Sequence, residues 1–392
     1  MIFPSRPPMA VLASALIISL STGASFAADR GNLPEVKNII FLVVDGMGLA
    51  NITAARIFRN GADGPPLHLE TLERVGYQRT YSANSTITDS AAGASAWACG
   101  EKFKNGEVCF HGDGRPPFPS LLELAKTKGM GTGLVTTGVI TDATPAAFGA
   151  HVVSRSCHTE IARQYIEVTA PDILLGGGAS RFNPSTPDRC GTQGDYILTA
   201  SKMGYTVLFN KTDLFEAVSG GTRKILGLFT AGGMTADHRR PPDCPEPRLP
   251  EMAAAALQRL ENEPKGFFLM MEGSQVDAGN HRNNLLYQIG EILAFDETVK
   301  KVLDWVHAGE ERKQQTLIVV TPDHETGGFA IHGPADRLGR PGEYILPGWT
   351  TTGHTGGDVV HWAQGPGSAR LGKALNNTDI YWILRDLMQA PR

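Results

Sequence analysis

The sequence predicts an α/β fold, a three-layer sandwich in which a central, mostly parallel sheet lies between helices on both faces. Two observations lead to this prediction. Short runs rich in Val, Ile, Leu and Phe recur along the chain and alternate with helical stretches. Hydrophobicity within each run is continuous rather than alternating, which is typical of strands buried on both faces of a parallel sheet.

The expected strands are 38–44, 131–137, 173–175, 205–209, 225–230, 266–271 and 316–321, and the expected helices are 121–128, 250–261 and 287–307. Two Gly- and Pro-rich stretches, 183–195 and 238–249, are expected to be surface excursions within one domain. No internal repeat is visible.

Composition and charge limit the possible functions. The 392 residues are 41% hydrophobic and 19% charged, which is ordinary for a globular enzyme. The formal net charge of -4 argues against nucleic acid or an anionic membrane as a partner. If the protein binds anions, the positive charge must be local and come from metal ions or a few arginines.

The N-terminal segment is typical of a signal peptide. Arg6 precedes an apolar run at 9–20, and Ser25-Phe26-Ala27 supplies the small residues of a cleavage site. We expect cleavage after Ala27, export to the periplasm or beyond, and a single catalytic domain over 28–392. A buried N-terminal helix is the alternative, but the flanking residues favour export. No later segment is long and apolar enough to span a membrane.

Acidic residues follow several of the expected strands. Asp45 follows 38–44, Glu272 follows 266–271, Asp323-His324 follow 316–321 after one proline, and Asp142 lies just beyond 131–137. Each residue alone would ordinarily be a helix cap or a turn residue. Together they should meet at the carboxyl edge of the sheet, where ligands bind in open α/β folds. Carboxylates gathered there repel one another unless cations neutralise them, so the pattern predicts a metal site.

Histidines extend this prediction. Asp277 and His281 are four residues apart and would share one face of a helix. His354 lies in the loop-like stretch T-T-G-H-T-G-G, where a lone histidine would more often be a solvated residue. Imidazoles with carboxylates suit zinc, whereas carboxylates, hydroxyls and water suit magnesium.

Ser90 is the candidate nucleophile. It lies in T-D-S-A-A-G, directly before an Ala-rich helical stretch, so its hydroxyl should sit at a helix N-terminus that favours anions. A simple capping role for Asp89 or Ser90 is the alternative. No neighbouring Lys or His could act as a base, so activation would require a metal ion.

These motifs together resemble the alkaline phosphatase family over residues 38–368. The matching stretches are V-V-D-G-M-G, T-D-S-A-A-G-A-S-A, T-D-A-T-P-A-A-F-G-A-H-V-V-S-R, M-E-G-S-Q-V-D-A-G-N-H, T-P-D-H-E-T-G-G and G-H-T-G-G, in the family's order. The resemblance implies an alkaline phosphatase-like fold and hydrolysis of phosphate monoesters with two zinc ions and one magnesium ion.

The resemblance also implies the roles of individual residues. One zinc would be held by Asp277, His281 and His354, the other by Asp45, Ser90, Asp323 and His324, and magnesium by Asp45, Thr144 and Glu272, with Asp142 acting on its waters. Ser90 would attack phosphorus with its hydroxyl ionised on the second zinc and form a phosphoserine. Arg155 would clamp two phosphate oxygens, oriented by Asp89.

The chain departs from the family's pattern in two places. Ala278 stands where many members carry Lys or His after the first-zinc aspartate, so the third metal could be Co²⁺ or zinc instead of magnesium. Only about 25 residues separate Gly328 from His354, where larger relatives insert a surface subdomain. A homodimer is common in the family, but this compact member leaves a monomer equally open.

The five cysteines allow two disulfides. Cys157 follows Arg155 by two residues, in a position resembling a bridged cysteine of the animal enzymes. On that resemblance we expect the pairs Cys109–Cys157 and Cys190–Cys244. Cys99, in the Ala-rich helix, is then expected to be a free, buried thiol. Spacing alone does not determine the connectivity.

Three other functions fit less well. A sulfatase needs Pro two and Arg four residues after its nucleophile, but Ser90 is followed by Ala-Ala-Gly, and Cys244 has Glu246 in the proline position. A two-zinc phosphodiesterase of the same superfamily typically lacks the arginine and the magnesium ligands found here. A periplasmic phosphate- or metal-binding protein would need no nucleophile.

Overall fold

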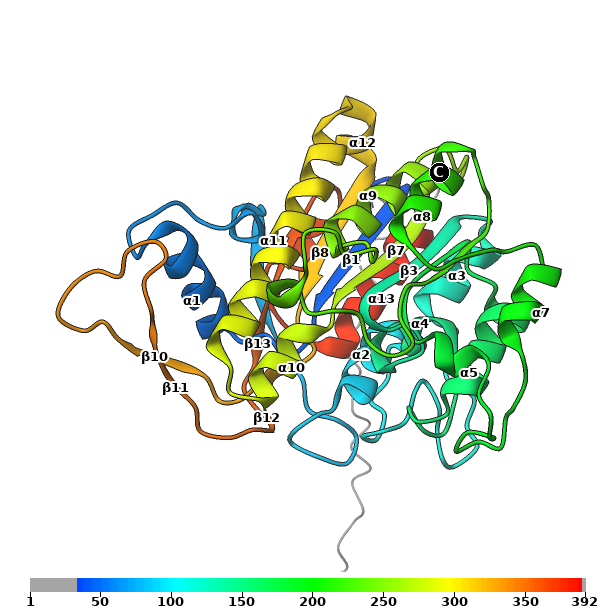
Figure 1. Ribbon diagram of the computed structural model, residues 1–392, viewed down its shortest axis with the longest axis horizontal. Coiled ribbons are helices and arrows are strands. Elements are labelled where there is room, and N and C mark those ends of the chain that lie inside the picture. The colour runs from blue at the N-terminus through cyan, green and yellow to red at the C-terminus, as the bar shows by residue number, and fades with distance from the viewer. Residues whose placement is uncertain (1–33, 390–392) are drawn as a thin grey trace, which may run out of the picture. The chain divides into compact units, whose positions relative to one another are not determined.

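Ten strands form the central sheet of the computed structural model, which describes residues 34–389 (Figure 1). Their order is β14-β2-β13-β8-β1-β7-β3-β4-β6-β5. The strands are β1 (Asn38–Val44), β2 (Arg74–Arg79), β3 (Gly131–Val139), β4 (Ile173–Gly177), β5 (Thr206–Leu208), β6 (Ile225–Leu228), β7 (Phe267–Gly273), β8 (Thr316–Thr321), β13 (Val359–Gln364) and β14 (Ala374–Asn376).

The sheet is mostly parallel. Strand β13 runs antiparallel to its neighbours β2 and β8, and the remaining neighbours pair in parallel. Each strand expected from a continuous apolar run is present, with ends that differ by a few residues. The predicted α/β class with a mostly parallel sheet is confirmed, whereas β2, β13 and β14 were not predicted.

Helices cover both faces of the sheet, as Figure 1 shows. One face carries α1 (Leu49–Asn60), α8 (Lys211–Ser219), α9 (Leu249–Leu260) and α11 (Leu285–His307), and the other carries α2 (Ser90–Cys99), α3 (Leu121–Thr127), α4 (Ala143–Gly149) and α13 (Asn377–Gln389). The helices expected at 121–128, 250–261 and 287–307 correspond to α3, α9 and α11. The three-layer prediction is therefore confirmed.

Strand β1 shows why the sheet is buried on both sides. Ile40 and Leu42 belong to the core cluster that includes residues of α9 and α11. Phe41 points to the other face, where its ring lies 5.6 Å from those of Trp97 and Phe148. Burying one such side chain contributes about 1.5–3 kcal/mol, so the central strands anchor the strand ends that follow them.

The remaining elements connect these layers. They are η2 (His68–Thr71), α5 (His158–Gln164), η3 (Tyr165–Thr169), α6 (Ala179–Phe182), α7 (Tyr196–Lys202), η4 (Asp237–Arg239), α10 (Gln275–His281), α12 (Glu310–Gln315), β9 (Glu325–Thr326), β10 (Ala330–Gly333), β11 (Leu346–Gly348), β12 (His354–Thr355) and η5 (Ser368–Arg370). The expected surface excursion at 183–195 contains no helix or strand, while the one at 238–249 includes the end of η4 and the first residue of α9.

The predicted signal peptide, residues 1–27, lies outside the described residues. Between residues 34 and 389, no helix combines the length and hydrophobicity needed to cross a membrane.

Candidate active site

Three adjacent strands carry acidic residues to one edge of the sheet. Strand β1 lies between β8 and β7, and the register pairs Val43 with Thr321 on one side and with Glu272 on the other. Asp45 and Asp323 each lie two residues beyond this level, so both follow their strands at the edge where Glu272 lies. The backbone N–H of Gly46 donates to Asp323 Oδ1 over 3.0 Å and ties the two strand ends together.

We call Asp45, Asp323 and His324 the inner cluster. One ligand atom from each lies within 4.8 Å of the others. His324 Nε2 is 3.1 Å from Asp323 Oδ2 and 3.7 Å from Asp45 Oδ1. Asp323 and His324 are 0% exposed, so this charged group is shielded from bulk water.

Ser90 lies against the inner cluster. It is the first residue of α2, as predicted, and its hydroxyl oxygen is 3.3 Å from His324 Nε2. Asp89 caps the helix, because its Oδ1 accepts a hydrogen bond from Ala92 N over 2.9 Å. The small residues of α2 allow this close approach: a Cβ on Gly93 would lie 3.3 Å from that of Asp323.

We call Asp277, His281 and His354 the outer cluster. The two residues from α10 lie on one face of the helix, as predicted, with His281 Nε2 3.1 Å from Asp277 Oδ2. His354 comes from β12, and its Nε2 is 3.7 Å from Asp277 Oδ1 and 3.2 Å from His281 Nε2. The ring of His354 stacks on that of His324 at 3.5 Å, so the two clusters are neighbours.

The turn after β1 runs so close to Asp277 of the outer cluster that only a glycine fits there. Gly46 has a positive φ of 73°, and a Cβ there would lie 2.7 Å from Asp277. Any other residue would push Asp277 away or unwind the turn, so the glycine in V-V-D-G-M-G serves the site directly.

In His281 and His354, a hydrogen bond at Nδ1 orients the ring so that Nε2 faces the outer cluster. His281 Nδ1 lies 2.6 Å from the carbonyl oxygen of Thr352, and His354 Nδ1 lies 2.9 Å from that of Thr88. Carbonyls only accept, so both Nδ1 atoms carry a proton and both Nε2 atoms face the cluster. Two Nε2 atoms 3.2 Å apart, beside the carboxylate of Asp277, are a donor arrangement that a zinc ion fits once they are deprotonated.

Thr326 fixes His324 in the same way. Its hydroxyl donates to Asp277 Oδ1 over 2.5 Å, since a carboxylate only accepts. The threonine oxygen, 3.2 Å from His324 Nδ1, then accepts the imidazole proton and leaves Nε2 of His324 free to face Ser90. Thr326 was not predicted as a functional residue. Its position two residues after His324 was the one feature of the sequence that could have indicated a contact with that histidine.

Several buried oxygens at this edge lack a hydrogen-bond donor. They are Asp45 Oδ1, Asp323 Oδ2 and Thr144 Oγ1. Burial, together with the negative charges of Asp323 and Asp277, raises the pKa of Asp45 well above its ordinary value. Orphaned oxygens among crowded carboxylates are costly unless a cation binds them, so the donor set fits metal ions.

The residues expected to bind magnesium lie beside the inner cluster. Glu272 is buried, and its Oε2 accepts from Thr136 Oγ1 over 2.5 Å. Burial raises the pKa of Glu272 to about 8. Thr144 is buried in α4. A carboxylate and a hydroxyl are hard oxygen ligands of the kind that magnesium prefers.

Arg155 lies between two acidic residues. Its Nη1 donates to Asp89 Oδ2 over 3.3 Å, and its Nη2 donates to Asp142 Oδ1 over 3.0 Å. Asp142 also caps α4 by accepting from Ala143 N over 2.7 Å. Burial opposes ionisation of Asp142, but the Arg155 charge outweighs it and lowers the pKa of Asp142. The carboxylates of Asp89, which precedes Ser90, and of Asp142 thus fix the plane of the guanidinium.

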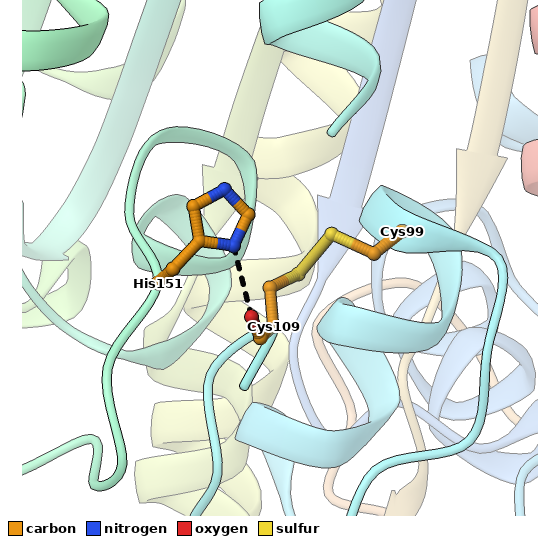
Figure 2. A group of neighbouring side chains, drawn as sticks. All are labelled: Cys99, Cys109 and His151. Carbon is orange, nitrogen blue, oxygen red and sulfur yellow. Dashed lines mark hydrogen bonds between the residues drawn. A yellow bond between two sulfur atoms is a disulfide. The ribbon is translucent and has the colours of Figure 1, made fainter. Parts of the chain in front are cut away.

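The disulfide prediction was wrong in its pairing. The bonds are Cys99–Cys109 and Cys157–Cys190, with Cα–Cα distances of 6.3 Å and 5.3 Å, and Cys244 is the free, buried cysteine among the described residues. Cys109 turns back onto α2, where its N–H donates to Ser95 Oγ over 2.9 Å, so its sulfur meets Cys99 (Figure 2). Cys157 directly precedes α5, and Asp188 of the loop that carries Cys190 accepts from Glu160 N in the first turn of that helix.

Comparisons with known proteins agree with this geometry. The family model described as alkaline phosphatase matches residues 36–346. Streptomycin-6-phosphate phosphatase of Streptomyces griseus is 35% identical over 95% of both chains, and alkaline phosphatase 3 of Bacillus subtilis is 30% identical over 96% of both. The solved alkaline phosphatase of the Antarctic bacterium TAB5 has a TM-score of 0.78 at 29% identity, covering 92% of this chain and 100% of that one.

Variants of the TAB5 enzyme were solved with Mg bound in a site called M3. Metal cofactors thus accompany this fold, in agreement with the donor set described above. These three relatives match nearly the whole described chain, and each is named as a phosphatase. The protein is therefore a phosphatase enzyme and belongs to the alkaline phosphatase family.

Proposed function

We propose that this enzyme hydrolyses phosphate monoesters through a phosphoserine formed at Ser90. The observation that carries the proposal is the position of the Ser90 hydroxyl, at the N-terminus of α2 and 3.3 Å from His324 of the inner cluster. Arg155 is bonded to Asp89, the residue that precedes Ser90. A nucleophile, an anion-favouring helix end and a guanidinium therefore converge on one small volume.

The outer cluster would hold one zinc ion, the inner cluster with Ser90 a second, and Asp45, Thr144 and Glu272 a magnesium ion. When bound, these ions supply Lewis-acid chemistry and neutralise the crowded carboxylates. The imidazole Nε2 atoms that face the outer cluster and the orphaned oxygens support this assignment. Ala278 leaves cobalt or zinc open at the third position.

The remaining chemistry belongs to the chain's own residues. The planar guanidinium of Arg155 would bind two nonbridging oxygens of the substrate phosphate, a bidentate task that suits arginine. Asp89 and Asp142 hold its plane from two sides, with Asp142 also expected to act on the waters of the third metal. The N–H groups at the start of α2 add partial positive charge where the phosphoryl group would lie.

The reaction balances in two displacements. A bond forms between Ser90 Oγ and phosphorus while the ester P–O bond breaks, and the alcohol leaves with a proton. Water then attacks the phosphoserine, which releases inorganic phosphate and restores the serine hydroxyl. The serine takes part covalently in both halves and is regenerated in each cycle.

The test replaces the nucleophile and a matched residue. Ser90→Ala should lower kcat by about three orders of magnitude or more, with residual turnover by direct attack of water. Ser120→Ala is the control, because Ser120 is also a buried serine at a helix N-terminus but lies at α3. Acid quenching of the wild type should trap phosphate on Ser90 in peptide mass spectra. Near-normal turnover of Ser90→Ala, or no phosphoserine at that residue, would refute the covalent mechanism.

We further propose that residues 1–27 are a signal peptide cleaved after Ala27, that 28–392 are a single catalytic domain, and that the enzyme acts outside the cytoplasm. Export supports disulfide formation, which agrees with the Cys99–Cys109 and Cys157–Cys190 bonds. N-terminal sequencing of the protein recovered from the periplasm or medium should begin at Ala28. The monomer and the homodimer remain alternatives that sedimentation would separate.

A further inference from the structure

The segment that follows the nucleophile helix reaches back to the proposed phosphate clamp. We call residues 100–109 the clamp loop; it leaves α2 after Cys99 and ends at Cys109. Its tip is the dipeptide Asn105-Gly106, a typical turn sequence. Neither residue had been predicted to take part in function. Both contact the residues that hold the phosphate-binding arginine.

Asn105 binds the backbone next to the nucleophile. Its Oδ1 accepts from Asp89 N over 3.1 Å, and its Nδ2 donates to the carbonyl oxygen of Ile87 over 2.9 Å. One side chain thus bridges two alternate residues of the irregular segment that leads into α2. This bridge fixes the backbone of Asp89, whose side chain holds Arg155.

Gly106 contacts both members of the Asp89–Arg155 pair. Its N–H donates to Asp89 Oδ2 over 3.0 Å, on the oxygen that also accepts from Arg155 Nη1. Its carbonyl oxygen accepts from the backbone N–H of Arg155 over 2.8 Å. Gly106 adopts a positive φ of 88°, a conformation that favours glycine. The loop therefore sets both the backbone and the side-chain end of the arginine.

The far end of the clamp loop is anchored on three sides. The Cys99–Cys109 disulfide joins it to the end of α2, and Cys109 N donates to Ser95 Oγ over 2.9 Å. On the other side His151 Nδ1 donates to the carbonyl oxygen of Cys109 over 2.8 Å, as Figure 2 shows. Val108 and Val152 form a two-way backbone bridge with N···O distances of 3.1 and 3.0 Å.

The conformation of Cys109 indicates that this anchoring is needed. Cys109 has a positive φ of 41°, a conformation that a residue with a Cβ rarely adopts. Such a conformation persists only where the surroundings hold it. The disulfide and the hydrogen bonds to Ser95 and His151 supply that restraint. They thereby fix the position of the loop tip relative to Asp89.

We propose that the clamp loop positions the phosphate clamp, with Asn105 and Gly106 as positioning residues for the Asp89–Arg155 pair and the Cys99–Cys109 disulfide as their anchor. The inference rests on the proposed role of Arg155 in phosphate binding. It assigns the loop no contact with substrate. Its effect is the orientation of a guanidinium that must meet two phosphate oxygens at once.

The test uses two glycines that differ in their contacts. Gly106 and Gly114 both have positive φ angles, 88° and 81°, and a Cβ on either would meet nothing within 4 Å. The backbone strain of an alanine is thus similar, but only Gly106 is bonded to the Asp89–Arg155 pair. Gly106→Ala should raise both the KM for a monoester and the inhibition constant of inorganic phosphate by about tenfold, the equivalent of about 1.4 kcal/mol. Gly114→Ala should leave both within about twofold.

Asn105→Ala and the pair Cys99→Ala/Cys109→Ala provide independent arms. Both should raise the phosphate inhibition constant in the same direction as Gly106→Ala, with kcat changed less than KM. Circular dichroism and melting temperatures report whether each variant is folded. If Cys99→Ala/Cys109→Ala does not fold, the single-residue variants still decide the matter.

A double-mutant cycle separates positioning from a structural effect. In an Arg155→Ala background, Gly106→Ala should change kcat/KM by less than about twofold, because the group it positions is gone. An equal loss in both backgrounds, or wild-type phosphate inhibition in Gly106→Ala and Asn105→Ala, would overturn the proposal. Failure of the proposed role of Arg155 would look different, because Arg155→Ala alone would then leave the phosphate inhibition constant at its wild-type value.

Discussion

The inner and outer clusters contain the same residue types in opposite surroundings. Asp323 and His324 of the inner cluster are fully buried, whereas the His281 side chain of the outer cluster is 39% exposed. The inner residues leave the ends of two central strands, while the outer ones come from a short helix and a two-residue strand. The first set is held by the core of the sheet and the second by peripheral elements.

This difference bears on how each cluster tolerates change. Removing one partner from a buried charged group leaves the other unpaired and typically costs 3–5 kcal/mol, whereas water can replace a lost contact at an exposed site. The inner cluster should therefore depend on all of its members and hold its ion tightly. The outer cluster should exchange its ion more readily and remain open to water and to departing alcohol.

The largest expected effect comes from breaking the two clusters separately. Asp323→Ala should abolish binding of one metal equivalent and lower kcat/KM by about a thousandfold or more, because Asp45 and His324 lose a buried partner. His281→Ala should weaken binding of the outer ion, and added zinc should restore much of the activity because water can take the vacant position at this exposed site. Metal content after dialysis, with activity against zinc concentration, measures both.

The matched control is Glu261→Ala, a surface residue paired with Arg312 far from either cluster. Its metal content should equal that of the wild type. Rescue of Asp323→Ala by zinc to the same extent as His281→Ala would contradict the distinction between the clusters.

The next effect concerns Arg155, which distinguishes monoesters from diesters. A monoester dianion offers two oxygens to the guanidinium, but a diester replaces one with an ester group and carries less charge. Charge-assisted hydrogen bonds contribute roughly 1.5–3 kcal/mol each, so Arg155→Ala should lower monoester kcat/KM by about tenfold to several thousandfold. Diester kcat/KM should fall far less. Equal losses on both substrates, or a wild type that prefers diesters, would show that Arg155 is not the clamp.

The sequence predicted the centre of the molecule better than its margins. Strand β1 is buried along its whole length, so its apolar run was unambiguous. Strand β2, near the edge of the sheet, alternates exposed and buried residues and contains a glycine, which hides it in a single sequence. Asp45 and Asp323 could be placed together because parallel strands end at one edge. The same logic does not extend to loops.

The clamp loop shows this limit. The turn sequence at Asn105-Gly106 indicated a loop, but its contact with Asp89 depends on tertiary packing that no local pattern encodes. The reversal at Cys109 has the same origin, because its positive φ is held by Ser95 and His151 from other segments. The incorrect disulfide pairing followed from this, since cysteine spacing carries no information on such a reversal.

Glu291 belongs to neither cluster, and it tests how burial alone changes the pKa of a carboxylate. Glu291 of α11 is 4% exposed, and its Oε1 accepts from Asp237 N over 2.6 Å. Burial raises the pKa of Glu291 to about 7. The unfolded chain releases this proton near pH 4.3, so the folded state binds the extra proton between about pH 4.3 and 7. Stability should therefore fall as pH rises through that window and then level off.

Glu291→Gln keeps the oxygen that accepts from Asp237 and removes the titration. Its free energy of unfolding relative to the wild type should improve by up to about 3 kcal/mol between pH 4.5 and pH 8. Denaturant unfolding at both pH values measures this. Glu297→Gln, on the same helix at the surface beside Arg248, is the control. A pH-independent difference for Glu291→Gln would refute burial as the cause.

The smallest expected effect lies at the bridge between the two clusters. The Thr326 hydroxyl donates to Asp277 of the outer cluster and accepts from His324 of the inner one. Thr326→Val removes the hydroxyl at nearly constant volume, and neither neighbour can recruit water easily because Thr326 is fully buried. The affinity for the outer ion should fall by about tenfold, since partners of metal ligands typically contribute 10- to 100-fold. Thr326→Ser restores the hydroxyl and should recover the wild-type value.

A chelator competition that resolves the two zinc ions makes the measurement independent of turnover. If the bridge couples the clusters, the inner ion should weaken in Thr326→Val as well, though less, because Asp323 still holds His324. Equal zinc affinities in the Val and Ser variants would mean that packing alone, and not the hydroxyl, orients the two ligands.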